Sequence, residues 1–125
     1  VGLSKEHLHR LPHELSGGQL KRVCIARALI VSPGCIVFDE STSGLDVTVR
    51  KQILNLLRSI QRDTRCTFLF ITHDIDVALY MADHVFVMRN GSIVESIQDV
   101  LSYDSFKHPY SKLLISSAAR HHINL

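Results

Sequence analysis

Two acidic residues and a histidine stand at the ends of two apolar runs of the chain. Asp39 and Glu40 directly follow residues 35–38, and His73 lies just beyond residues 66–71. Each run is typical of a strand buried on both faces, and the strand–helix–strand order predicts that the two strands are parallel. Because ligands bind where the carboxyl ends of parallel strands share one edge, we expect the three side chains to converge there. Taken singly, the acids also fit helix caps and the histidine a surface loop, but the joint arrangement favours a site.

A glycine-rich turn provides the second candidate site. Ser16, Gly17 and Gly18 stand immediately before a long helical pattern, in the pentapeptide LSGGQ at residues 15–19. The first turn of a helix presents backbone N–H groups and partial positive charge, which suits an anion and most often a phosphate. Two glycines let the anion approach the backbone with no Cβ in the way. On its own the pentapeptide fits a flexible turn with Ser16 as N-cap better than a site, so its interpretation depends on the other motifs of the chain.

The elements that must position these residues alternate between helix and strand. Residues 11–16 are expected to form a loop, and Asn90–Gly91 is typical of a hairpin turn. The order indicates an α/β fold with a mostly parallel sheet and right-handed crossovers. The expected helices span residues 4–10, 17–31, 47–62, 75–82, 98–103 and 110–119, and the expected strands span residues 35–38, 66–71, 84–88 and 92–97.

The composition bounds the class of protein. The chain has 125 residues, of which 46% are hydrophobic, and this is enough for one domain with a sizeable core. The net charge is +2 with both signs interspersed, so nothing indicates a nucleic-acid partner. No apolar run reaches membrane-spanning length. Cys24, Cys35 and Cys66 lie far apart and are expected to be buried thiols of a reducing compartment.

Four motifs occur in a fixed order along the chain. They are LSGGQ before a helix, CIVFDE ending a strand, SGLD after that strand and ITHD ending the next strand. In order, spacing and structural context they resemble the C-terminal half of an ABC-transporter nucleotide-binding domain, over at least residues 11–97. The resemblance implies a partial P-loop NTPase (RecA-like) core joined to the end of the ABC helical subdomain. Residues 1–31 would end that subdomain, residues 32–97 would form the core, and residues 98–125 would be a C-terminal extension of importer type.

The resemblance assigns a role to each acid and to the histidine. Asp39 matches the aspartate that helps to hold Mg²⁺, generally through water, and a carboxylate on a rigid strand end suits such a hard cation. Glu40 matches the catalytic glutamate, which orients or deprotonates the attacking water. His73 matches the switch histidine near the γ-phosphate of ATP. Because phosphoryl transfer needs mostly positioning and neutralised charge, one well-placed base is sufficient.

The resemblance assigns the glycine-rich turn and the SGLD loop to a dimer. In this family the serine and the two glycines of the signature LSGGQ contact the γ-phosphate of ATP held by the opposite subunit. The SGLD segment matches the D-loop, which couples the two domains of the dimer. Each ATP site is therefore completed by the partner. The nucleotide-binding positions assigned in this way are Ser16, Gly17, Gly18, Gln19, Ser43 and Asp46.

The chain departs from the family pattern at several positions. Ser41 stands where the family usually has proline after the glutamate, and this should loosen the D-loop slightly. Lys21 stands where glutamine is common, while Arg22 keeps the matching arginine position. No G-x-x-x-x-G-K-[ST] motif occurs, although that loop cradles the β- and γ-phosphates. The sequence, which starts with Val1, is therefore expected to be a fragment that does not hydrolyse ATP alone. Without the other half of the domain, its apolar sheet faces are expected to be uncovered.

The C-terminal stretch narrows the resemblance. HPYS at residues 108–111, followed by Leu113 and Leu114, resembles a segment of the dipeptide, oligopeptide and nickel importer ATPases. The resemblance implies an ATP- and Mg²⁺-dependent ATPase at the cytoplasmic face of the cell membrane, bound peripherally to transmembrane permease subunits. It also implies a second ATPase subunit, identical or different, and indirectly an extracytoplasmic substrate-binding protein. The cargo, peptide or metal chelate, stays open because the ATPase touches neither.

Two other functions remain open at this point. One is a non-catalytic half-domain that contributes its signature to a partner's ATP site. Such a half-domain would carry the same four motifs and would lack the phosphate-binding loop. A soluble ABC-type ATPase of DNA repair or translation is disfavoured by the importer-type residues 108–114.

The histidines near the two ends of the chain are weak candidates for a metal site. His7, His9 and His13 lie close together in sequence, but Pro12 interrupts any common helical face and no cysteine or acid completes a ligand set. The pair at residues 121 and 122 lies near an end of the chain that is expected to be frayed.

Overall fold

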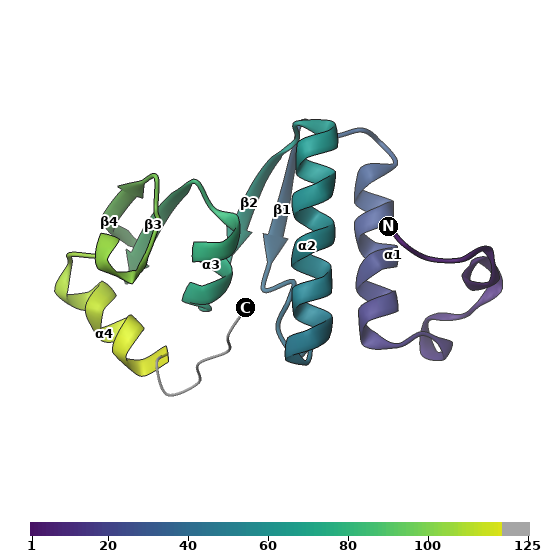
Figure 1. The fold of residues 1–125 in the computed structure, drawn as a ribbon, viewed down its shortest axis with the longest axis horizontal. Coiled ribbons are helices and arrows are strands. Elements are labelled where there is room, and N and C mark those ends of the chain that lie inside the picture. The colour runs from purple at the N-terminus through teal and green to yellow at the C-terminus, as the bar shows by residue number, and fades with distance from the viewer. Residues whose placement is uncertain (119–125) are drawn as a thin grey trace. The chain divides into compact units, whose positions relative to one another are not determined.

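The computed structural model describes residues 1–118, and the chain divides into two compact units between Ile71 and Thr72. Figure 1 traces the elements of both units along the chain. The last residue of the helix expected over 110–119, and the histidines at 121 and 122, lie outside the described residues. Within residues 1–118, no helix has both the length and the apolar character that a bilayer span requires.

The first unit is built on two parallel strands joined by a long helix. Its elements are, in chain order, the 3₁₀ turns Lys5–His9 and Pro12–Glu14, α1 (Gly17–Leu29), β1 (Cys35–Asp39), α2 (Val47–Thr64) and β2 (Thr67–Ile71). In the parallel register Cys35 lies opposite Thr67, and Asp39 lies opposite Ile71. Helix α1 packs beside α2 (Figure 1). The strand–helix–strand order therefore gives the parallel pair that the sequence predicts.

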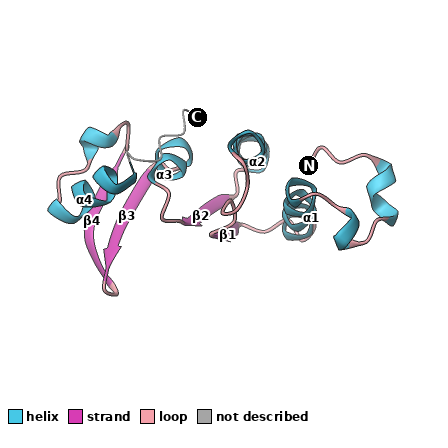
Figure 2. Ribbon diagram, turned by 90° about the horizontal axis from the view of Figure 1, so that it is seen from below, coloured by secondary structure: helices cyan, strands magenta, loops and turns pink. Residues whose placement is uncertain are grey.

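Helix α2 covers one face of the strand pair (Figures 1 and 2). Its apolar side chains Ile53, Leu54 and Leu57 are each at most 1% exposed and form the centre of the first unit's core. Phe38 on β1 stacks on its register partner Phe70, with ring centroids 4.7 Å apart. Burial of these large side chains is the main force that holds α2 on the strands.

The opposite face of the strand pair is exposed. Val37, Leu69 and Ile71 are 56%, 50% and 49% exposed, because alternate residues of a strand point away from α2 and nothing in the described part of the first unit covers them. The prediction that both strands are buried on both faces is therefore wrong. The expectation that an apolar sheet face is uncovered is confirmed.

The N-terminal segment differs from the expected elements. The helix expected over residues 4–10 is a 3₁₀ turn of five residues, Lys5–His9, and Pro12 begins a second such turn within the expected loop. Proline is well placed there because its missing N–H has no partner at the start of a helical turn. Helix α1 ends at Leu29, two residues before the expected position, and Ile30 is 83% exposed.

Only one of the three cysteines is buried. Cys66 is 4% exposed, whereas Cys24 and Cys35 are exposed, and all three are free thiols. Cys35 begins β1 on the same exposed face as Val37, so the apolar run does not bury it. The prediction of three buried thiols is therefore wrong for Cys24 and Cys35.

The second unit is a hairpin packed against helices. Its elements are α3 (Ile75–Met81), β3 (His84–Arg89), β4 (Ser92–Gln98), a 3₁₀ turn (Tyr103–Ser105) and α4 (Pro109–Ala118). Strands β3 and β4 are antiparallel, and the turn between them has positive φ at both Asn90 and Gly91, as the sequence predicts. The core of this unit centres on Val87, Val100 and Phe106.

The helix expected over residues 98–103 does not form. Strand β4 runs to Gln98, and the Asp99 N–H then donates to the Asp83 carbonyl at 2.8 Å, which extends the hairpin instead. Asp99 also has a positive φ of 49°, which is incompatible with a right-handed helix. The run between the strand and Tyr103 is therefore too short and too constrained to start a helix.

Candidate functional site

The glycine-rich turn begins α1 through a reciprocal cap. The Ser16 Oγ accepts the Gln19 N–H at 3.3 Å, and the Ser16 N–H donates to Gln19 Oε1 at 2.9 Å. Gln19 Nε2 then donates to His7 Nε2 at 3.0 Å, which ties the turn to the first 3₁₀ turn. Gly17 and Gly18 occupy the first two positions of the helix, where backbone N–H groups have no intrahelical acceptor. The turn therefore has the geometry of an anion-binding helix start.

The glycines of this turn pack against the beginning of α2. A Cβ placed on Gly18 would lie 2.7 Å from Val49 Cγ1, and one placed on Gly17 would lie 3.6 Å from Leu45 Cδ2. The two predicted nucleotide-binding segments, the glycine-rich turn and the SGLD loop, are thus neighbours within the first unit. From the sequence, only the family resemblance links these two segments, because no local pattern indicates that Gly18 contacts Val49.

The loop after β1 holds the two acids in place. Asp39 ends the strand and is exposed, and Glu40 has a positive φ of 47°. The Glu40 N–H donates to the Ile71 carbonyl of β2 at 2.9 Å. Both the N–H and the Oγ of Ser43 donate to the Glu40 carbonyl, at 3.1 and 2.7 Å. The backbone of Glu40 is therefore fixed from both sides, without the proline that the family has after it.

Asp46 begins α2 and fixes the end of the same loop. Its Oδ1 accepts the Val49 N–H at 2.9 Å, and its carbonyl accepts the Arg50 N–H at 2.9 Å. The Asp46 carboxylate thus serves as an N-cap in the structure. Its role in the D-loop, which would couple two domains of a dimer, stays a prediction.

His73 belongs to the second unit and is exposed. It stands between Thr72, whose Oγ1 accepts the Asp74 N–H at 3.0 Å, and Asp74, whose Oδ1 caps α3 by accepting the Asp76 N–H at 3.0 Å. The convergence of His73 with Asp39 and Glu40 stays a prediction. What supports it is the register, which ends β1 beside Ile71, two positions before His73 in the chain.

The residues present are compatible with Mg²⁺ held jointly with a nucleotide. Among residues 1–118, no group of three or more His, Cys, Asp or Glu side chains could hold a metal ion by itself. Mg²⁺ keeps most of its waters and commonly takes one or two carboxylates together with phosphate oxygens. Asp39, an exposed carboxylate on a strand end, fits one such ligand.

The HPYS segment is held by a carboxylate from the neighbouring strand, which sequence reasoning did not identify. Glu95 Oε1 accepts the N–H groups of Lys107 and His108, at 2.6 and 3.0 Å. His108 Nδ1 accepts the Tyr110 N–H at 3.1 Å at the start of α4. Burial raises the pKa of Glu95, but the nearby Ser111 hydroxyl and the two N–H groups together hold that pKa below its ordinary value. The segment is therefore anchored to β4.

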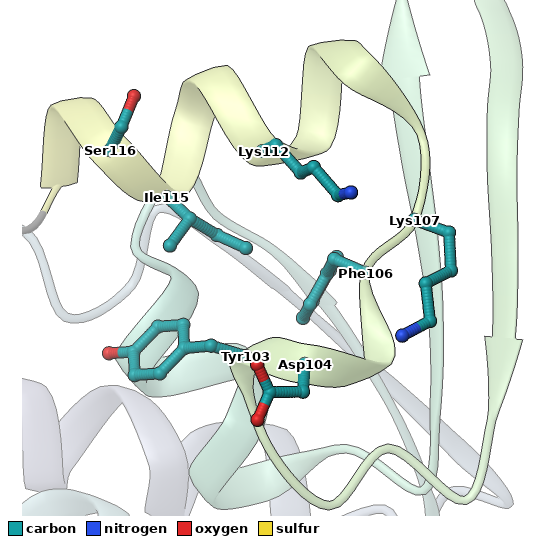
Figure 3. A pocket seen from close by; sticks show the side chains of 7 residues that line it. All are labelled: Tyr103, Asp104, Phe106, Lys107, Lys112, Ile115 and Ser116. Carbon is teal, nitrogen blue, oxygen red and sulfur yellow. The ribbon is translucent and has the colours of Figure 1, made fainter.

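A shallow pocket of the second unit lies between the last 3₁₀ turn and α4 (Figure 3). It has a volume of about 330 Å³, and none of the predicted site residues lines it. Tyr103 donates from its hydroxyl to an Asp76 carboxylate oxygen. This hydrogen bond, with burial and the charges of Asp76 and Asp74, raises the pKa of Tyr103 to about 12. The lining residues are Tyr103, Asp104, Phe106, Lys107, Lys112, Ile115 and Ser116.

Sequence comparisons agree with the motifs. The family model described as "ABC transporter" matches residues 1–43. The chain is 45% identical over 117 residues to the oligopeptide transport ATP-binding protein OppF of Bacillus subtilis. It is 47% identical over 117 residues to the dipeptide transport ATP-binding protein DppF of Lactococcus lactis. Each alignment covers 94% of this chain and 38% of the relative, so the chain spans about two fifths of the length of these relatives.

Solved structures give the same result for the fold. The ATP-binding cassette MJ1267 of an ABC transporter matches with a TM-score of 0.73 and 34% identity, over 88% of this chain and 44% of that one. The cassette MJ0796, as a dimer bound to ADP and phosphate, matches with a TM-score of 0.66 and 32% identity, over 80% of this chain and 42% of that one. The helices and the small parallel sheet are consistent with part of a P-loop nucleotide-binding fold. The chain is thus confirmed to resemble, over nearly its full length, one part of the ATP-binding subunits of ABC transporters.

Proposed function

We propose that this chain is part of the ATP-binding and ATP-hydrolysing subunit of an ABC importer for peptides. The observation that supports this best is the capped turn Ser16–Gln19, which is seated against the SGLD loop in the first unit. The names of the relatives favour oligopeptides or dipeptides as cargo over nickel or metal chelates. The order of parts proposed is the end of the helical subdomain at 1–31, the core at 32–97 and an importer-type extension at 98–125.

Asp39 and Glu40, at the end of β1, are proposed to act on ATP bound at the same edge of the sheet. ATP supplies the phosphoanhydride bond, and Mg²⁺ supplies positive charge that neutralises the phosphates. Asp39 would hold the ion through water, and Glu40 would orient a water and accept its proton. The fixed backbone of Glu40 supports this role because a base acts efficiently only when its position is set in advance. His73 is proposed to contact the γ-phosphate.

The glycine-rich turn is proposed to act on ATP held by a second subunit. Gly17 and Gly18 would present their backbone N–H groups, and Ser16 its hydroxyl, to the γ-phosphate across a dimer, with Gln19 keeping the turn capped. Ser43 and Asp46 would lie at the same interface. The partners proposed are this second ATPase subunit, identical or different, the transmembrane permease subunits and, indirectly, an extracytoplasmic binding protein. The complex would place the chain peripherally at the cytoplasmic face of the membrane.

A chimera tests the proposed function. The matching segment of Bacillus subtilis OppF is replaced by this chain, so that the relative supplies the remainder of its own subunit. We expect ATP turnover by the chimera and a fall of about 10²- to 10⁴-fold for Glu40→Gln, because the general base is lost. The matched control is Glu6→Gln, an exposed glutamate of the first 3₁₀ turn, which should leave turnover unchanged.

Two results would contradict the proposal. A folded chimera that binds ATP but does not hydrolyse it would favour the non-catalytic half-domain instead. Equal turnover by the Glu40→Gln and Glu6→Gln chimeras would remove Glu40 from the reaction.

A further inference from the structure

We propose that Val49 is a positioning residue for the glycine-rich turn, which it holds in register with the SGLD loop. The proposal rests on the proposed function, because the turn matters in this way only when it contacts a nucleotide. Val49 lies on the first turn of α2 and contacts neither ATP nor Mg²⁺ in that function. Its effect is to fix where Gly17 and Gly18 stand relative to Asp46.

The first observation is the space around Gly18. A Cβ on this residue would lie 2.7 Å from Val49 Cγ1, which is shorter than any ordinary contact between two carbon atoms, and 3.9 and 4.0 Å from two further Val49 carbons. A valine side chain in a helix has one strongly preferred rotamer, so Val49 cannot turn away without cost. Gly18 lies within α1 and no left-handed φ is involved, so the backbone conformation does not itself require glycine. The requirement for glycine at this position is therefore steric and comes from within the same chain.

The second observation is how firmly Val49 is held. Its N–H donates to Asp46 Oδ1 at 2.9 Å, so the residue that caps α2 also fixes the backbone that presents the valine. On the other side of the contact, Leu45 Cδ2 lies 3.6 Å from the Cβ position of Gly17. Both glycines of the turn therefore rest on residues within three positions of Asp46. A displacement of the SGLD loop has to move the turn with it, because close-packed side chains transmit displacement.

The contact predicts a specific pattern of rescue. Gly18→Ala overpacks the contact, and Val49→Ala opens a space in the same place. The double variant Gly18→Ala/Val49→Ala restores the fit, because the added methyl group occupies the volume that the valine leaves. Such compensation is expected for two residues in contact and not for two that act independently.

The test uses the OppF chimera and compares variants by ATP turnover, by nucleotide affinity and by the unfolding midpoint without nucleotide. Gly18→Ala should lower turnover about tenfold or more and lower the midpoint, and the double variant should recover most of both losses. Val49→Ala alone should lower turnover without changing nucleotide affinity, and Val49→Thr, which keeps the branched shape, should restore it. The controls are Gly34→Ala, which meets no atom within 4 Å, and Val31→Ala, a valine that is 75% exposed.

The outcomes separate this inference from the proposed function. The positioning role is overturned if the turnover losses of Gly18→Ala and Val49→Ala simply multiply in the double variant and its unfolding midpoint does not recover. Val49→Ala turnover equal to that of Val31→Ala also overturns it. A chimera without any ATP turnover refutes the proposed function, while the midpoints of the same variants still decide whether Val49 packs beneath the turn.

Discussion

The anchor between Glu95 and the HPYS segment gives the sharpest stability prediction. One carboxylate oxygen accepts two backbone N–H groups, from Lys107 at 2.6 Å and from His108 at 3.0 Å. A hydrogen bond to a charged group contributes about 1.5–3 kcal/mol to stability. Here two donors share one oxygen of the half-buried Glu95 side chain, so their two contributions do not add fully. We therefore expect Glu95→Ala to destabilise the docking of α4 by about 2 kcal/mol, and Glu95→Gln by about half of that.

Hydrogen exchange at the two amides measures this loss. In the OppF chimera, a loss of about 2 kcal/mol corresponds to roughly thirtyfold faster exchange of the Lys107 and His108 N–H groups in Glu95→Ala. Asp104→Ala is the matched control, because Asp104 is an exposed carboxylate of the adjacent 3₁₀ turn. Equal exchange rates in the Glu95→Ala and Asp104→Ala chimeras would refute the reasoning.

The same anchor sets a pH dependence. The pKa of Glu95 in the folded chain lies below its ordinary value of 4.5, because the nearby Ser111 hydroxyl and the hydrogen bonds from the Lys107 and His108 N–H groups together outweigh the effect of burial. A carboxyl group whose folded pKa is depressed stabilises the fold above its unfolded pKa and loses that stabilisation as the pH falls through the folded value. Protection of the two amides should therefore be constant near neutral pH and decrease in the acid range below 4.5.

Contacts and exposed faces in the two units give three further predictions. Tyr103→Phe should destabilise the second unit by about 1 kcal/mol, since it removes the hydroxyl that donates to Asp76, and the absorbance of the Tyr103 phenolate should titrate near 12. Ser16→Arg should block ATP-driven dimerisation of the chimera in size-exclusion chromatography, and an unchanged dimer would contradict the assignment of Ser16 to a partner's ATP. Leu69 lies on the bare face of the strand pair and is 50% exposed, so Leu69→Lys should raise the solubility of the 125-residue chain. A wild-type chain that is already soluble and unfolds cooperatively would contradict the expected effect of the bare face.

The parts of the fold that depend on local signals could be predicted. The Asn90–Gly91 turn needs positive φ at both residues, and these residue types provide it cheaply. The parallel pairing of β1 and β2 results from a helix between two apolar runs. The cap at Ser16 results from a serine three positions before Gln19, a spacing that satisfies two backbone donors at once.

The parts that depend on long-range packing could not be predicted. An apolar run shows which residues prefer burial, but it does not show whether a second layer is present to cover Val37. Glu95 lies 12 residues before Lys107, and nothing in a strand of mixed residues marks one carboxylate as a cap for a distant helix. The contact of Gly18 with Val49 likewise depends on how α1 and α2 pack, which no sequence period determines. The roles of Asp39, Glu40 and His73 came from the family resemblance and stay predictions.

The cap at the start of α1 explains why a hydroxyl side chain is well suited to residue 16. Aspartate caps helices as well as serine does, but its carboxylate has only acceptors and a negative charge that would repel a phosphate. The Ser16 oxygen accepts the Gln19 N–H and keeps its own proton, so the same atom that starts the helix has one donor left for an approaching anion. In the proposed function, anion binding and helix initiation therefore would not compete for Ser16, and the helix would stay intact while the anion binds and leaves.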